Sequence, residues 1–222
     1  MAATQDIFTP ASLTVKQLFN NSDSLYQIPR YQRPYKWADE QIDKLWDDLT
    51  EAYENQTESY FLGSVITAAP KDTSSYLDIV DGQQRITTLM IMFAVVRDLY
   101  KTLNRNPANP DPSNITSKTI KSSILADDEF NRLKLYTHIN HQTDFENLII
   151  NADTTLIVKP KKKQIESDEE PRYKFLNTAA MFNERLSAKG EEYVGKFINY
   201  LFNSVRLIRI DCTSKEFAIK LF

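Results

Sequence analysis

The sequence predicts an α+β fold, in which strands and a long buried helix are followed by a mainly helical part. Two segments rich in aromatic and β-branched residues, YFLGSVITA and YLDIV, are predicted to be strands. The segment after them, Gln83 to Asn104, is apolar on nearly every side, which is typical of a central buried helix. Late in the chain, VRLIRIDC predicts a further strand after two helical segments.

The composition limits the class of protein. With 222 residues, 41% hydrophobic content and 11% aromatics, the chain is long enough for a substantial core. Its net charge of −3 gives no general attraction to nucleic acid, so a DNA contact would need a local basic patch. The lone Cys212 excludes a disulfide framework and a cysteine zinc site. No segment reads as a secretory signal or membrane span, so we expect a cytoplasmic protein without a membrane partner.

The first elements follow from caps and periodicity. Thr14 can cap a short helix, and Leu25 to Tyr31 is expected to be extended because Pro29 and Pro34 flank its end. Residues 38–56 should form an amphipathic helix with an acidic outer face, since apolar residues recur there at three- and four-residue spacing. The predicted strands Tyr60–Ala68 and Tyr76–Val80 should pair as a hairpin.

The second half is predicted to be mainly helical. Between a proline-rich loop (104–118) and a charged loop (159–172) we expect a short helix, the strand RLKLY and a helix around residues 145–150. Helices over 173–188 and 191–203, the strand 205–212 and a last helix capped by Ser214 should follow. We therefore divide the chain into a core (1–104), a loop (105–118) and a helical extension with a returning strand (119–222), which we expect to be truncated at its C-terminus.

The motif DGQQR, Asp81 to Arg85, stands where the second strand meets the long helix. A helix N-terminus attracts anions, Gly82 lets a ligand approach the backbone, and Arg85 offers a fork suited to phosphate. Gln83 and Gln84 add amide groups, and Asp81 could hold Mg²⁺ or orient a water. The motif thus predicts a phosphate site. In the alternative interpretation, Asp81 only caps the helix and pairs with Arg85.

A second cluster, IPRYQRPYKW (28–37), combines basic and aromatic residues on a segment that two prolines keep extended. Such a mixture can neutralise phosphates and stack bases. In the alternative interpretation, Tyr31, Tyr35 and Trp37 anchor the core while the cations face water.

These motifs carry a family resemblance. IPRYQRPYKW, then FLGSV (61–65), then DGQQRITTL (81–89), in this order and spacing, resemble the N-terminal domain of GmrSD-type restriction endonucleases. RLKLY, FENLI and RIDCTSKEFAIKLF resemble later segments of that family more loosely. The resemblance implies a ParB/sulfiredoxin-like fold, with a small mixed sheet around a buried central helix. It also implies an NTPase, with GTP favoured, that uses Mg²⁺ in a defence system restricting modified foreign DNA.

The resemblance also implies residue roles and partners. Asp81, Gln83, Gln84 and Arg85 would be catalytic. The nucleotide would further contact the residues Gly82, Ile86, Thr87, Tyr31, Gln32, Arg33, Gly63 and Ser64. If the basic and aromatic cluster binds DNA, its contacts would be Arg30, Arg33, Tyr35 and Lys36. The partners implied are a nucleotide, DNA, an HNH-type nuclease domain outside this sequence, and possible further copies of the chain. The sequence has no HNH motif and just two histidines, so DNA cleavage by this chain is not expected.

Other signals are weaker. His138 and His141 form H-x-x-H without the cysteines or carboxylates that would complete a metal site. Lys159 to Lys163 are followed directly by acidic residues, which favours a solvated loop over a DNA contact. Two functions therefore remain open: an NTPase, and a DNA-sensing module that binds phosphates without hydrolysis. A purely structural adaptor is the third alternative.

Overall fold

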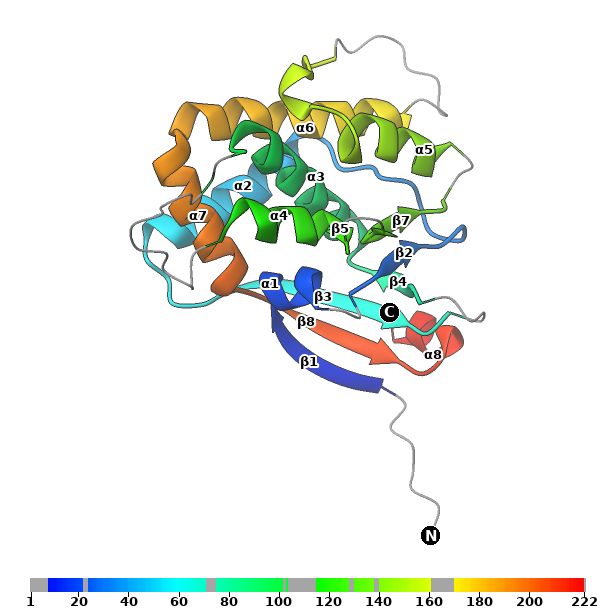
Figure 1. Ribbon diagram of the computed structural model, residues 1–222. Helices are drawn as coiled ribbons and strands as arrows, with labels where there is room; N and C mark the ends of the chain where they lie inside the picture. Colours follow the sequence, from blue (N-terminus) through cyan, green and yellow to red (C-terminus); the bar gives the residue numbers. More distant parts are fainter. Residues whose placement is uncertain are drawn as a thin grey trace.

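The computed structural model describes residues 8–21, 24–70, 75–101, 103, 115–127, 130–137, 140–160 and 170–221. Its centre is a mixed sheet of six strands in the order β1-β8-β3-β4-β2-β7 (Figure 1). Most of the helices lie over one face of this sheet, above it in the view of Figure 1, whereas α8 lies near its lower right edge. The α+β prediction, with a mixed sheet and a mainly helical later part, is confirmed.

The strands of the sheet come from both halves of the sequence. They are β1 (Phe8–Thr14), β2 (Tyr26–Ile28), β3 (Tyr60–Ala68), β4 (Leu77–Asp81), β7 (Leu133–Leu135) and β8 (Val205–Cys212). The predicted hairpin is confirmed, because β3 and β4 pair antiparallel. β8 lies between β1 and β3, antiparallel to the first and parallel to the second. β2 runs parallel to both β4 and β7. A separate pair is formed by β5 (Leu125–Ala126) and β6 (Phe130–Asn131).

The helices match the predicted positions closely. They are α1 (Val15–Asn20), α2 (Asp39–Glu54), α3 (Gln83–Leu99), α4 (Ser117–Ile124), α5 (His141–Phe145), α6 (Glu170–Lys189), α7 (Glu191–Asn203) and α8 (Lys215–Lys220). Thr14 and Ser214 cap α1 and α8 as predicted, each accepting a hydrogen bond from a backbone N–H. A π-helical turn (Glu146–Ile150) continues α5, and a 3₁₀ turn (Thr154–Leu156) follows it. The predicted loops at 104–118 and 159–172 lie largely outside the described residues.

The predicted central helix is confirmed: α3 is buried along almost its whole length, from Gln83 to Val96. Its core includes Phe182 and Phe202 from the later helices and Leu207 from β8, so residues from both halves pack together. The other face of the sheet has a smaller cluster, in which Ala218 of α8 packs with Ile66, Val80 and Cys212. Cys212 is buried there, as expected of a small hydrophobe, and burial raises the pKa of its thiol.

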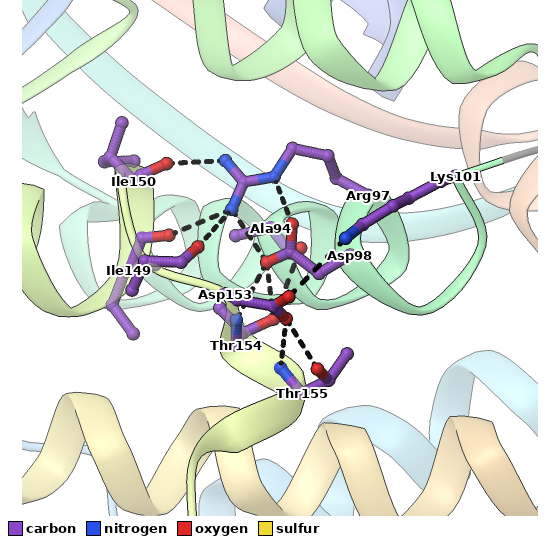
Figure 2. Close-up of polar contacts among 10 residues, drawn as sticks. Ala94, Arg97, Asp98, Lys101, Ile149, Ile150, Asp153, Thr154 and Thr155 are labelled. Atoms are coloured by element: carbon purple, nitrogen blue, oxygen red, sulfur yellow. Dashed lines mark hydrogen bonds and ion pairs between the residues drawn. The ribbon is translucent and has the colours of Figure 1, made fainter.

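The C-terminal end of α3 is joined to the segment that follows α5 by a polar cluster (Figure 2). Arg97 donates hydrogen bonds to the carbonyl oxygens of Ile149, Ile150 and Ala152 and to the neighbouring Asp98. The Asp98 carboxylate also accepts from the backbone N–H and the hydroxyl of Thr154. We call these contacts the Arg97–Asp98 clamp. It holds the π-helical and 3₁₀ turns against the central helix.

Across the described ranges, every helix is too short or too polar to cross a lipid bilayer.

Candidate functional site

The junction between β4 and α3 opens into a cavity. β4 ends at Asp81, and Gly82 adopts a left-handed conformation with φ 86° before α3 begins at Gln83. The backbone of Ser64 and Val65 lies so close that a Cβ on Gly82 would be 3.0 Å from the Ser64 carbonyl oxygen. Only glycine fits a position that combines this φ with this approach. The cavity beside it has a volume of about 740 Å³, within the usual range for a small-molecule site.

The cavity brings the two predicted motifs together. Its lining residues are Tyr31, Gln32, Arg33, Trp37, Val80, Asp81, Gly82, Gln83, Gln84, Arg85 and Ile219. Eight of these were predicted site residues. Trp37, Val80 and Ile219 were not, although Trp37 belongs to the basic and aromatic cluster. Ile219 lies on α8 at the end of the chain, and no sequence signal linked it to DGQQR. The motifs therefore share one site, which α8 helps to enclose.

Arg85 is held by β3. Its Nη1 donates a hydrogen bond to the carbonyl oxygen of Ser64 at 3.1 Å, and its guanidinium lies over Gly63. Burial lowers the pKa of Arg85, while the nearby Asp81 carboxylate acts in the opposite direction. An arginine keeps its charge at any ordinary pH, so this partly buried cation is an attractive site for an anion.

Asp81 does not cap α3. The N-cap is Gly82, and the cap makes no side-chain hydrogen bond. Among the described residues, the ion pairs within 4 Å do not join Asp81 to Arg85 either. The capping part of the alternative interpretation is therefore wrong, and Asp81 interacts with Arg85 through charge alone, at more than the distance of an ion pair. Asp81 and the first residues of α3 line the same cavity.

The two glutamines of the motif differ. Gln84 Oε1 accepts from the Lys36 backbone N–H at 2.7 Å, and its Nε2 donates to the Pro34 carbonyl oxygen at 3.1 Å. Gln84 thus links α3 to the proline-flanked segment through two hydrogen bonds. Gln83 is equally buried, at 6% exposed, but its Oε1 has no hydrogen-bond partner. Of the two, Gln83 has the amide with hydrogen-bonding capacity to spare.

Tyr31 and Gln32 are fixed against β4 and α8. Gln32 Nε2 donates to the Val80 carbonyl oxygen at 2.7 Å, which ties its side chain to the end of β4. The Tyr31 hydroxyl lies 3.5 Å from an Asp78 oxygen, and Lys215 Nζ stands 3.3 Å from the centre of the Tyr31 ring. Burial, reinforced by the Asp78 carboxylate, raises the pKa of Tyr31. Tyr31 is 42% exposed and lines the cavity.

Three predicted site residues lie in the core instead. Tyr35 is buried, shares hydrogen bonds with the hydroxyls of Thr88 and Thr178, and stacks on Phe175. Burial raises its pKa to about 12. Tyr35 therefore cannot stack on a nucleic-acid base, and for this residue the core-anchor interpretation is correct.

The side chains of Ile86 and Thr87 are also buried, at 0% and 1% exposed. The Ile86 N–H donates to the Gly82 carbonyl oxygen, and the Thr87 hydroxyl donates to the Gln83 carbonyl oxygen. Both residues belong to the first closed turn of α3. Neither presents a side chain or a spare N–H to a ligand, which corrects their predicted contact with a nucleotide.

The predicted basic residues do lie at the surface. Arg30, Arg33 and Lys36 are exposed, and Lys36 pairs with Glu170 of α6 at 3.7 Å. Arg33 lines the cavity, so it belongs to the site as well as to the surface beside it.

No cluster of three or more metal-ligating side chains occurs within the described ranges. His138 of the H-x-x-H motif falls outside those ranges. His141 is buried and shares a hydrogen bond of 2.7 Å with the Thr137 hydroxyl.

Comparison with models of known protein families identifies a match. The family described as GmrSD restriction endonuclease, N-terminal domain, matches residues 15–222. A comparison with curated proteins finds no match.

Proposed function

This chain belongs to the family of GmrSD restriction endonuclease N-terminal domains, and from that premise we propose that it binds and hydrolyses a nucleoside triphosphate, with GTP favoured. The family places the chain in restriction enzymes and hence in a defence-related role. Nucleotide turnover in this domain would regulate an HNH-type nuclease domain outside this sequence. The target would be modified foreign DNA, and further copies of the chain could take part.

The observation that carries the proposal is the position of Arg85 next to the N-terminus of α3, where both line the same cavity. The free N–H groups of a helix N-terminus and an arginine fork are the two groups that most often hold phosphate oxygens. Here both border a cavity of about 740 Å³, which has room for a nucleotide. The aromatic rings of Tyr31 and Trp37 on the same wall offer surfaces for a base.

The groups in the cavity are sufficient in kind for phosphoryl transfer, which needs positioning and charge neutralisation more than covalent chemistry. Arg85 and the α3 N–H groups would hold phosphate oxygens. Gln83, whose amide oxygen makes no hydrogen bond to the protein, would orient the reacting groups. The amide of Gln84 is instead held by two hydrogen bonds to residues 34 and 36.

Asp81 fits the role of a magnesium ligand. It is the one carboxylate among the residues that line the cavity, and Mg²⁺ commonly binds through one or two carboxylates together with phosphates and waters. When bound, the ion would supply positive charge to the phosphate oxygens.

Equilibrium binding of labelled GTP, ATP and CTP in the presence of Mg²⁺ tests the proposal. We expect saturable binding that Arg85→Ala abolishes while the variant stays folded. Arg206→Ala is the matched control, because the Arg206 side chain donates hydrogen bonds to Ser12 of the edge strand β1 and does not line the cavity, so binding should be unchanged. A folded wild-type chain that binds none of the three nucleotides would disprove nucleotide binding by this chain.

A second candidate is a DNA sensor that binds without hydrolysis. It is favoured by the exposed Arg30, Arg33 and Lys36, which lie on the segment that borders the cavity. In this case the same anion site would hold a DNA phosphate, and the surface cations would hold its neighbours. Binding would then weaken steeply with salt, and no nucleotide would be turned over.

A further inference from the structure

A second cavity lies next to the candidate site and is much smaller. Its volume is about 10 Å³, close to the least that holds one water molecule. It shares Arg33, Gln83 and Gln84 with the larger cavity. Its remaining polar residues are Tyr35, Thr87, Thr137 and His141, and the rest of the wall is aliphatic or aromatic. The Tyr35 hydroxyl already shares hydrogen bonds with Thr88 and Thr178. The small cavity is therefore a pocket behind the wall of the site.

Gln83 has a buried acceptor that a water molecule in this cavity could satisfy. Its side chain is 6% exposed, and its Oε1 is buried without a hydrogen-bond partner in the described residues. A buried acceptor without a partner costs about 1–3 kcal/mol, so such atoms are usually satisfied by protein or by ordered water. The atom needs a donor, and Gln83 is among the residues that line the small cavity.

Another residue of the small cavity, Thr137, offers a second partner. Thr137 follows β7, and its hydroxyl shares a hydrogen bond of 2.7 Å with Nδ1 of His141, the first residue of α5. A hydroxyl has one proton and two acceptor sites. The bond to His141 therefore leaves the Thr137 oxygen able to accept from a water, whichever of the two atoms is the donor.

We propose that this cavity holds one ordered water, which donates one hydrogen bond to Gln83 Oε1 and another to Thr137 Oγ1. The water needs two to four polar partners, and these two acceptors use both of its protons. Gln83 would then be fixed from behind, with its amide plane set by a chain that runs from His141 through Thr137 and the water.

The consequence for hydrolysis rests on the proposed function. If Gln83 orients reacting groups in the larger cavity, Thr137 is a positioning residue that acts through it. A loosely held glutamine would still allow the nucleotide to bind, because Arg85 and the α3 N-terminus hold the phosphates. It would slow the chemical step, because orientation is lost.

The first test is a crystal structure of the wild-type chain at a resolution that shows ordered waters, together with one of Thr137→Val. Valine keeps the shape of threonine but cannot accept a hydrogen bond. We expect a water within hydrogen-bond distance of Gln83 Oε1 in the wild type, and its loss with a new Gln83 rotamer in Thr137→Val. An empty cavity in the wild type, or an unchanged Gln83 in the variant, would overturn the proposal. The wild-type structure decides the matter even if the variant does not fold.

The second test measures nucleotide turnover. Thr137→Val should lower kcat by about fivefold, the effect of one neutral hydrogen bond, and leave KM unchanged. Thr137→Ser keeps the hydroxyl and should restore kcat. Equal kcat in wild type and Thr137→Val would remove Thr137 from hydrolysis. If the wild type does not hydrolyse nucleotide, the proposed function fails, and the two crystal structures still decide whether the water positions Gln83.

Discussion

The guanidinium of Arg85 lies directly over Gly63, so that a Cβ on Gly63 would be 2.8 Å from Arg85 Nη1. Gly63 stands at an irregularity in the pairing of β3 with β8, and its φ of +129° is one that side-chain-bearing residues rarely adopt. The Ser64 carbonyl oxygen beside it accepts the hydrogen bond from Arg85. The cation of the DGQQR motif thus depends on a glycine in a different strand.

We predict that Gly63→Ala displaces Arg85 and weakens nucleotide binding. The methyl group would take the space of the guanidinium, and the unusual φ adds a strain of about 1–3 kcal/mol. Thermal unfolding and equilibrium nucleotide binding, measured on the same preparation, separate the two effects. Affinity should fall as far as it does in Arg85→Ala.

Ser64→Ala is the matched control for this experiment. Ser64 was predicted to contact the nucleotide, but it is not among the residues that line the cavity. It holds Arg85 through its backbone carbonyl, which the substitution retains, so nucleotide affinity should stay at the wild-type level. An unchanged affinity in folded Gly63→Ala would show that nucleotide binding does not depend on the contact between Arg85 and Gly63.

Substituting the two glutamines should have different effects: loss of Gln84 should lower stability, and loss of Gln83 should lower activity. Gln84→Ala leaves the Lys36 N–H and the Pro34 carbonyl without partners, so we expect a loss of about 2–4 kcal/mol in the free energy of unfolding. Gln83→Ala removes an amide whose oxygen makes no hydrogen bond to the protein, so stability should change little and turnover should fall. Urea unfolding and nucleotide hydrolysis measure the pair. The reverse pattern would show that the roles are exchanged.

Much of this site could be predicted from the sequence, because a strand, Asp-Gly and an apolar helix follow one another directly. What could not be predicted is how each side chain is used. Gln83 and Gln84 are chemically identical neighbours. Only the path of residues 34–36 decides which of them makes hydrogen bonds to that segment. Ile219 reaches the cavity because β8 inserts next to β3, and such a long-range pairing leaves no local signal.

The fold shows the same division. Residues 60–68, 191–203 and 205–212 were predicted with the bounds that the structure has. β1 was missed, because FTPASLT contains a proline and little apolar alternation. It is an exposed edge strand, which pairs with β8 alone and tolerates Pro10. The central helix ends at Leu99, earlier than the predicted Asn104.

Arg30→Ala tests the DNA-sensing alternative. Arg30 is exposed and does not line the cavity, whereas Arg33 does, so Arg30 is the cleaner probe of a surface phosphate contact. If DNA binds there, affinity should fall at all sequences, and the slope of log K against log salt should decrease by about 1. Nucleotide affinity should not change. A salt slope equal to that of the wild type would exclude Arg30 from the DNA interface.

The Arg97–Asp98 clamp should be a major source of stability. Asp98 has a side chain 8% exposed and accepts from Arg97 and Thr154, so Asp98→Ala leaves the Arg97 cation without its carboxylate. We expect a loss of about 3–5 kcal/mol in the free energy of unfolding. Glu192→Ala breaks an exposed pair with Lys196 and should unfold at the same denaturant concentration as wild type. Equal midpoints for both variants would show that the clamp contributes nothing.

Asp81→Asn should change nucleotide binding in opposite directions with and without magnesium. With Mg²⁺, losing a carboxylate ligand should weaken binding by about tenfold or more, since contacts to charged groups contribute about 1.5–3 kcal/mol. With EDTA, the wild-type carboxylate faces the phosphates without a cation between them, so its neutralisation should strengthen binding. Asp47→Asn, on the exposed face of α2, controls for the change in net charge. Titrations of both variants in the two buffers measure the effect. If Asp81→Asn weakens binding equally in both, Asp81 contacts the nucleotide or supports the fold and does not hold the metal.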